Sequence, residues 1–248
     1  MDNKNIDYDV LFTPYKIGKV TIKNRIGMSA MGLFSANTDG SPSMFTSAFY
    51  EDRARGGTGL IIVGASMVSR AAANGITGMY WEDKSVVPHH TDIVERCHRY
   101  GAKAAIAIGV GSGRNAFLTM LDGKQPVSAS AIPSRWDPNL LCHPLTVDEI
   151  HEYVAGYEQA AYRAKCAGYD IIEVHAHCGY LIDQFMSPLW NHREDEYGGS
   201  VKKRCNFPVE IIRAVRRGGG EDFVIEVRIS GEETGVPGGY GVEQSIEF

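Results

Sequence analysis

Two histidines, a cysteine and a tyrosine stand within six residues of one another, at His175, His177, Cys178 and Tyr180. They follow a largely apolar, β-branched run at 171–174 that is short enough to be a buried parallel strand. Parallel strands of α/β proteins present catalytic side chains at their carboxyl ends, so the cluster is a candidate site for proton transfer. The alternative is a strand end with two solvated histidines, and these residues alone leave it open.

A longer pattern surrounds this cluster. After His175 come Gly179-Tyr180-Leu181, Gln184-Phe185, Ser187-Pro188, Asn191, Arg193, Asp195, Tyr197-Gly198-Gly199-Ser200 and Arg204. A second pattern, L-F-x-P-x-K-I-G-x-x-x-x-K-N-R, covers residues 11–25. Both segments resemble the Old Yellow Enzyme family of flavin oxidoreductases. Two distant parts of the chain therefore indicate one family.

The elements that must position the cluster alternate along the chain. Residues 11–25 read as a β-hairpin that turns at Gly18-Lys19. Strands are then expected at 26–30, 60–63, 104–108, 171–174 and 223–229, with helices at 43–55, near 91–100, from Thr146 to Gly168, and after Ser200. Strands that alternate with helices pair in parallel. The expected fold class is α/β, a TIM (β/α)8 barrel of which about five N-terminal units are present.

Five strand and helix units are too few for a closed barrel, which has eight. An open sheet edge leaves backbone groups unpaired and apolar faces in water. We therefore expect residues 1–248 to form the N-terminal part of a single FMN-binding TIM-barrel domain, with its C-terminal units missing from this sequence.

The resemblance implies a binding site for flavin mononucleotide (FMN) at the carboxyl ends of the strands. Ala30, Met31, Gly32 and Ala65 would lie along the isoalloxazine ring, because small residues allow a flat ring to approach the backbone closely. Arg228 would face the electron-rich end of the ring, where a cation stabilises the reduced flavin.

The resemblance also implies substrate contacts on the same rim. His175 would donate a hydrogen bond to a substrate carbonyl, with Cys178 and Arg114 beside it, and Tyr180 would deliver a proton to the α-carbon. Arg114 ends the glycine-rich run 109–114, which lacks the helix that a dinucleotide fingerprint requires. We expect that run to be a flexible active-site loop.

The reaction implied is an ene-reduction. NAD(P)H gives hydride to FMN, which passes it to the C=C bond of an enone, an enoate or an enoyl-CoA-like compound. One branch of the family, similar to dienoyl-CoA and enoate reductases, also carries an iron-sulfur cluster and FAD, which this chain could gain only from a missing C-terminal region.

Three positions depart from the family pattern. Cys178 stands where Asn or His is usual, and a thiol is a much weaker donor. His177 could substitute, because in a regular strand it shares the face of His175. Ile108 replaces a glutamine that bonds the flavin, and Gly32 replaces a thiol or hydroxyl that tunes the ring. These departures indicate an atypical branch.

Composition narrows the class of partner. The net charge of −5, without a basic cluster, argues against nucleic acid or an anionic membrane as a partner. The five cysteines are widely spaced and form no compact metal motif, so no metal is expected. The amino terminus lacks a signal-peptide pattern, which favours the cytoplasm. The sequence is compatible with a homo-oligomer.

Two other readings stay open. The chain could be a non-catalytic partial barrel that needs a partner chain along its open edge, and it would then be colourless when purified. A flavin-free barrel lyase or aldolase would need a Schiff-base lysine or metal ligands at the strand ends, and the sequence shows neither.

Overall fold

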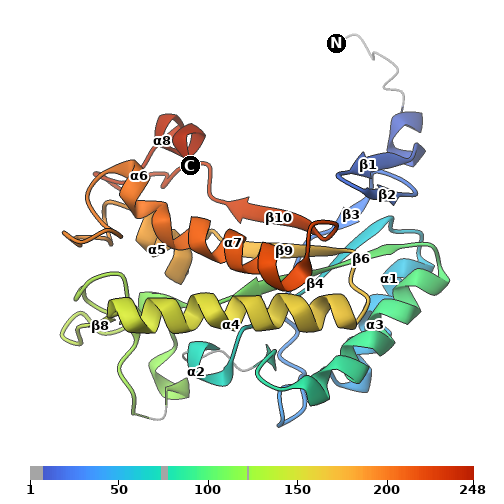
Figure 1. Cartoon of the computed structure of the whole chain (residues 1–248), viewed down its shortest axis with the longest axis horizontal. Coiled ribbons are helices and arrows are strands. Elements are labelled where there is room, and N and C mark those ends of the chain that lie inside the picture. Colours follow the sequence, from blue (N-terminus) through green and yellow to red (C-terminus); the bar gives the residue numbers. More distant parts are fainter. Residues whose placement is uncertain (1–7, 74–77, 122) are drawn as a thin grey trace.

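The sheet of this protein is covered by helices on one side, as Figure 1 shows. The computed structural model describes residues 8–73, 78–121 and 123–248. Residues 1–7, at the amino terminus where no signal-peptide pattern is found, lie outside the described residues, as do 74–77 and 122.

Five parallel strands make the sheet. They are β3 (Gly27–Met28), β4 (Leu60–Met67), β6 (Lys103–Gly109), β9 (Ile171–Ala176) and β10 (Val224–Ile229), in the spatial order β10-β9-β6-β4-β3. The short β5 (Met79–Tyr80) pairs with the end of β4, and every pairing in the sheet is parallel. The expectation of five units of a parallel β/α barrel is confirmed. β4 runs on to Met67, past its expected end, with a register shift between Val63 and Ser66.

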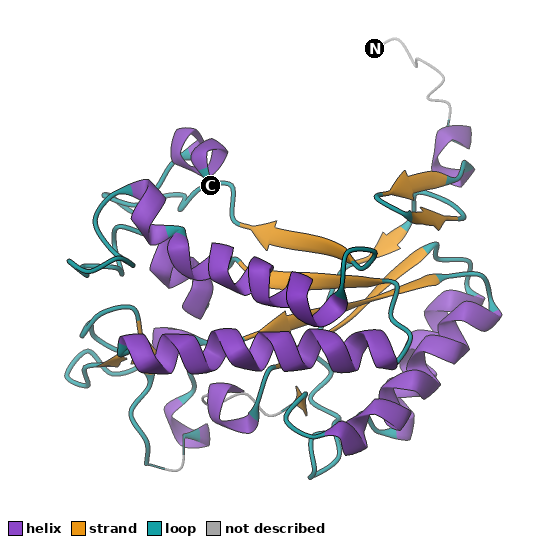
Figure 2. Ribbon diagram, viewed as in Figure 1, coloured by secondary structure: helices purple, strands orange, loops and turns teal. Residues whose placement is uncertain are grey.

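Four helices connect the strands and cover the outer face of the sheet, as Figure 2 shows. They are α1 (Met44–Arg55), α3 (Val87–Arg99), α4 (Val147–Cys166) and α7 (Asn206–Gly219). α4 begins with a capping box at the expected Thr146, since Thr146 accepts from the Glu149 backbone N–H and Glu149 accepts from the Thr146 backbone N–H. α3 begins earlier than expected, because Pro88 is tolerated in a first helical turn.

The two faces of each strand pack differently, because side chains alternate along a strand. In β6, Ile106 and Ile108 belong to the large outer core beneath the helices, whereas Ala105 and Ala107 face the concave inner side. The inner cluster is small and lies at the amino-terminal ends of the strands. It includes Ile22 of the hairpin β1 (Tyr15–Ile17) and β2 (Val20–Ile22), which closes that end.

Sequence patterns missed the short elements. These are α2 (Arg70–Ala73), β7 (Val127–Ser128), β8 (His143–Pro144), α5 (Leu181–Met186), α8 (Val242–Glu247) and the 3-10 turns at Asp9–Phe12, Lys84–Val86, Gly113–Asn115 and Leu118–Met120. The helix expected after Ser200 is divided into α6 (Val201–Arg204) and α7. Segments of two to six residues are too short to show a period. All six residues of α5 are buried, so that helix has no polar face to reveal it. In the described part of the chain, no helix has the length and apolar character that a membrane span requires.

Candidate active site

β9 delivers the histidines to the concave side of the sheet. His175 points there because it alternates with Val174 and Ala176, which are buried against the helices. The ring of His177 stacks on that of His175 with centroids 4.1 Å apart, and the Tyr180 ring meets the His175 ring edge-on at 5.0 Å. The strand end therefore holds three aromatic side chains as one packed group.

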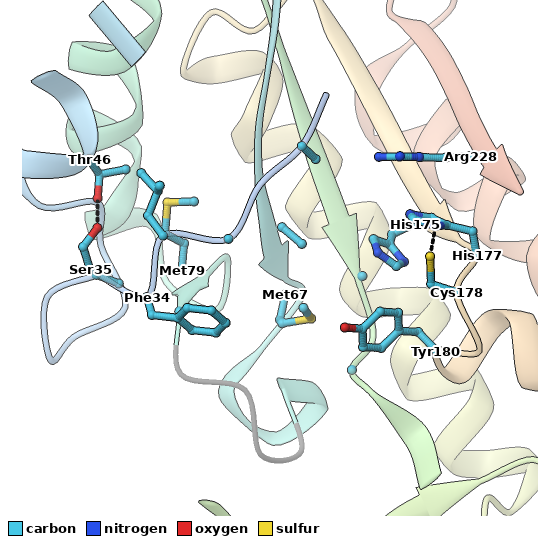
Figure 3. A pocket seen from close by; sticks show the side chains of 18 residues that line it. Phe34, Ser35, Thr46, Met67, Met79, His175, His177, Cys178, Tyr180 and Arg228 are labelled. Atoms are coloured by element: carbon cyan, nitrogen blue, oxygen red, sulfur yellow. Dashed lines mark hydrogen bonds between the residues drawn. The ribbon is translucent and has the colours of Figure 1, made fainter. Parts of the chain in front are cut away.

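This group lines a cavity of about 360 Å³, seen in Figure 3. The figure shows the β9 residues and Arg228 along one side, with Phe34 and Met79 across from them. Of the residues expected at the site, seven line the cavity: Ala30, Gly32, Ala65, His175, Cys178, Tyr180 and Arg228. These come from four strands or the loops that follow them, so the carboxyl ends of the strands share one hollow.

Met31 and Arg114, which were expected beside the other site residues, do not line this cavity. Met31 sits between Ala30 and Gly32 in an extended segment, so its half-exposed side chain points away from the lining residues on either side. The Arg114 guanidinium instead lies 4.2 Å from the centroid of the Trp190 ring and donates to the carbonyl of Pro133 at 3.1 Å. Ile108 likewise faces the helices and is fully buried there.

The imidazoles of the cavity are held neutral. Burial, together with the neighbouring His177 ring and the Arg228 cation, lowers the pKa of His175 to about 4. Burial and Arg228 also lower the pKa of His177. A neutral imidazole has one N–H donor and one acceptor nitrogen, so each ring can donate a single hydrogen bond at neutral pH.

Cys178 occupies a strained position between these groups. Its backbone φ is +59°, an uncommon conformation for a residue with a side chain. Its sulfur lies 2.7 Å from Nδ1 of His177, and its backbone N–H donates to the Ser230 hydroxyl at 3.0 Å. His177 and Cys178 both line the cavity, although a regular strand would have placed them on opposite faces.

Asp183 holds this turn in place, and the motif did not identify it as a functional residue. Its buried carboxylate accepts from the Gly179 backbone N–H at 2.7 Å, from the Ser230 hydroxyl at 3.0 Å and from the Tyr240 hydroxyl at 2.5 Å. Burial and the bond to Asp183 raise the pKa of Tyr240 above its ordinary range. The carboxylate thus joins the turn before Tyr180 to the segment after β10.

Beneath the cavity the concave side carries a buried carboxyl. Glu173 is 1% exposed, and its Oε1 has no hydrogen-bond partner among the described residues. Burial and the nearby carboxylate of Glu226 raise the pKa of Glu173 to about 7, while Arg228 opposes that rise. The inner face therefore combines neutral imidazoles with carboxyls and a cation, unlike the apolar outer face.

The lining suits a flat aromatic cofactor with an electron-rich edge. At Gly109 a methyl group would lie 3.4 Å from the Met67 sulfur and 3.7 Å from Cβ of His175, so glycine keeps this wall low. Ala65 adds only a small side chain, and Arg228 supplies a cation at one side. A flavin ring fits this combination of small residues and one positive charge.

The fold is an open, parallel part of a β/α barrel with a cavity at the carboxyl ends of its strands, and comparison with known proteins gives its family. The chain belongs to the NADH:flavin oxidoreductase / NADH oxidase family, whose profile matches residues 10–248. This is the family of the Old Yellow Enzymes, so the resemblance seen in the sequence is confirmed.

Individual relatives agree with this assignment. The chain is 39% identical over 229 residues to a cinnamate reductase of Clostridium sporogenes, covering 90% of this chain and 34% of the relative. It is 41% identical over 240 residues to an NADPH dehydrogenase of Listeria monocytogenes, covering 96% and 68%.

Solved structures show the same fold. A 2-naphthoyl-CoA reductase complex superposes with a TM-score of 0.89 at 26% identity, covering 97% of this chain and 38% of that chain. A morphinone reductase in complex with tetrahydroNAD gives 0.83 at 30% identity, covering 95% and 68%. The chain spans about a third of the length of the cinnamate reductase and about two thirds of the NADPH dehydrogenase.

Proposed function

We propose that this chain forms the flavin and substrate site of an FMN-dependent ene-reductase that uses NAD(P)H and reduces an activated C=C bond. The observation that carries the proposal is the convergence of His175, Tyr180 and Arg228 on one cavity whose lining also includes the small residues Ala30, Gly32, Ala65 and Gly109. The relatives named for cinnamate and for 2-naphthoyl-CoA support an α,β-unsaturated carbonyl compound as the substrate class.

In this proposal, the small residues of the cavity and Arg228 bind the cofactor. Ala30, Gly32, Ala65 and Gly109 would hold the ring of FMN, and Arg228 would stabilise negative charge on it. When bound, FMN takes a hydride from the nicotinamide and supplies it to the β-carbon of the substrate.

Orientation and protonation of the substrate fall to the end of β9. Neutral His175 donates its N–H to the carbonyl oxygen, where negative charge develops, and His177 and Cys178 line the same cavity beside it. The Tyr180 hydroxyl makes no hydrogen bond with the described residues, so its proton is free to pass to the α-carbon.

Flavin chemistry tests the proposal directly. We expect the purified chain to bind added FMN and quench its fluorescence, to bleach anaerobically with NADH or NADPH, and to regain colour when an enone is added. Protein that binds no FMN, or whose bleached form is not reoxidised by any enone or enoate, contradicts the proposal. That result favours a non-catalytic partial barrel.

A further inference from the structure

A second cavity, of about 250 Å³, adjoins the first. The two share Phe34, Cys178 and Tyr180 in their linings, so the tyrosine stands at the junction. Phe34 has a backbone φ of +48°, which is uncommon for a bulky residue, and 69% of its surface is exposed. The backbone therefore holds an aromatic ring in the open where the two cavities meet.

The far wall of the second cavity is a stack of aromatic rings. Phe117 and Trp136 lie with centroids 5.3 Å apart and planes inclined by 20°. The Trp136 Nε1 donates to the carbonyl of Asn115 at 3.1 Å, which fixes the orientation of the indole. Both rings are about half exposed, at 49% and 51%, so a ligand that covers them removes apolar surface from water.

The wall is joined to the catalytic turn. The Asn115 side chain, which follows the glycine-rich run, donates to the carbonyl of Gly179 at 2.7 Å. Gly179 directly precedes Tyr180, so the hydrogen bond fixes the aromatic wall relative to the residue at the junction. The linings of the two cavities are therefore connected by a direct hydrogen bond as well as by the residues that they share.

We propose that the second cavity binds the aryl group of the substrate while the reducible C=C bond lies in the first, an inference that rests on the proposed ene-reductase activity. A dry cavity of about 150 Å³ is enough to hold benzene, so the observed volume accommodates a phenyl ring. The exposed aromatic wall of Phe117 and Trp136 favours a flat ring over a saturated chain, because offset stacking adds to the gain from burial. The substrate class is then an aryl-substituted α,β-unsaturated carbonyl compound.

A matched pair of enones tests this inference. 4-Phenyl-3-buten-2-one and 3-penten-2-one differ only by phenyl and methyl at the same carbon. We expect Phe117→Ala to lower kcat/KM for the phenyl compound about tenfold, as the loss of one aromatic contact predicts, and to change the methyl compound less than about twofold. The control is Phe45→Ala, because Phe45 is 64% exposed and lines neither cavity.

A binding measurement separates this inference from the proposed function. The saturated ketone 4-phenyl-2-butanone cannot be reduced at a C=C bond, and its dissociation constant, measured by NMR titration, should rise about tenfold in Phe117→Ala. If the unaltered chain reduces neither enone, the proposed function fails, and this titration still decides the subsite. Equal losses on both enones, an effect confined to the KM of the nicotinamide, or an unchanged titration overturn the inference.

Discussion

The outer and inner faces of the sheet use the same five strands for different purposes. On the outer face, Ile106 and Ile172 sit in a continuous apolar core beneath four helices. On the inner face, the intervening position of β9 is Glu173, with an unpaired buried oxygen, and the next is His175, with a lowered pKa. The outer face gains stability from packing, whereas the inner face keeps polar groups that an apolar core would exclude. Stability and chemistry are thus assigned to alternate residues.

Among the changes considered, we expect the largest effect on the reaction rate from Tyr180→Phe on the inner face. Tyr180→Phe removes the O–H that would protonate the α-carbon, so alkene reduction should slow about 10²-fold to 10⁴-fold, or about 3–5 kcal/mol of barrier. The rate of flavin reduction by the nicotinamide should stay the same, and so should the free energy of unfolding. Stopped-flow measurement of the two half-reactions checks this. The control is Tyr162→Phe, because the Tyr162 side chain of α4 is exposed. Equal slowing of both half-reactions would exclude Tyr180 as the proton donor.

Ile106 provides the opposite case on the outer face. Ile106 is fully buried, so Ile106→Ala leaves a cavity beneath the helices. The change should lower the free energy of unfolding by about 2–5 kcal/mol. Under conditions where the variant is still folded, its affinity for FMN should stay within about twofold of the original, because the side chain does not face the cavity.

Urea denaturation measures the effect of Ile106→Ala, and Ile246→Ala is the matched control, since that residue is 80% exposed. A large loss of FMN affinity in folded Ile106→Ala would show that the two faces are not independent.

The buried Glu173 on the inner face should lower the free energy of unfolding when it is ionised. Its pKa is about 7 in the folded chain and near its ordinary value of 4.5 when unfolded, so the folded state binds more protons between these values. The free energy of unfolding therefore falls as pH rises from about 4.5 to 7. Glu173→Gln, which does not titrate, should remove that decline and be the more stable protein above pH 7.

Thermal or urea unfolding from pH 5 to pH 8 measures this difference. Glu243→Gln, at an exposed position in α8, should give no gain that depends on pH. A gain of Glu173→Gln over the original chain that is the same at every pH would rule out ionisation of Glu173 as the cause.

The smallest predicted effect lies at the start of α4. Thr146→Ala removes the side-chain acceptor of the capping box and should cost about 1 kcal/mol of stability. Thr146→Ser keeps the hydroxyl and should restore most of that loss. FMN affinity should be the same in all three proteins, and a change in the alanine variant alone would connect the outer helix to the cavity.

The sequence was sufficient for the order of strands and helices and for one rim of chemical groups. Periodicity located β4, β6, β9 and β10, and the family motif placed His175 and Tyr180 at a strand end. Five parallel strands then bring their carboxyl ends together, so seven of the residues expected from the sequence line one cavity.

The two expected residues that do not line the cavity come from segments without a period. β3 has only two residues, so the sequence could not show that Ala30 and Gly32 face the cavity while Met31 does not. Arg114 lies in the turn Gly113–Asn115, and its side chain contacts Trp190, 76 residues further along the chain.

Long-range contacts were also beyond sequence reasoning. Asp183 meets Ser230 and Tyr240, which are 47 and 57 residues further along the chain. A hydrogen-bond network between such distant residues leaves no local pattern.

The alternation along β9 bears on how new specificities could be selected in the laboratory. A library that varies Glu173, His175 and His177 together, with Ile172, Val174 and Ala176 unchanged, samples new chemistry in molecules that still fold. Insertion of a single residue into the same strand would instead exchange the two sets, directing imidazole into the packed core and valine into the cavity. Substitutions here are therefore tolerable steps for evolution, whereas insertions and deletions are not.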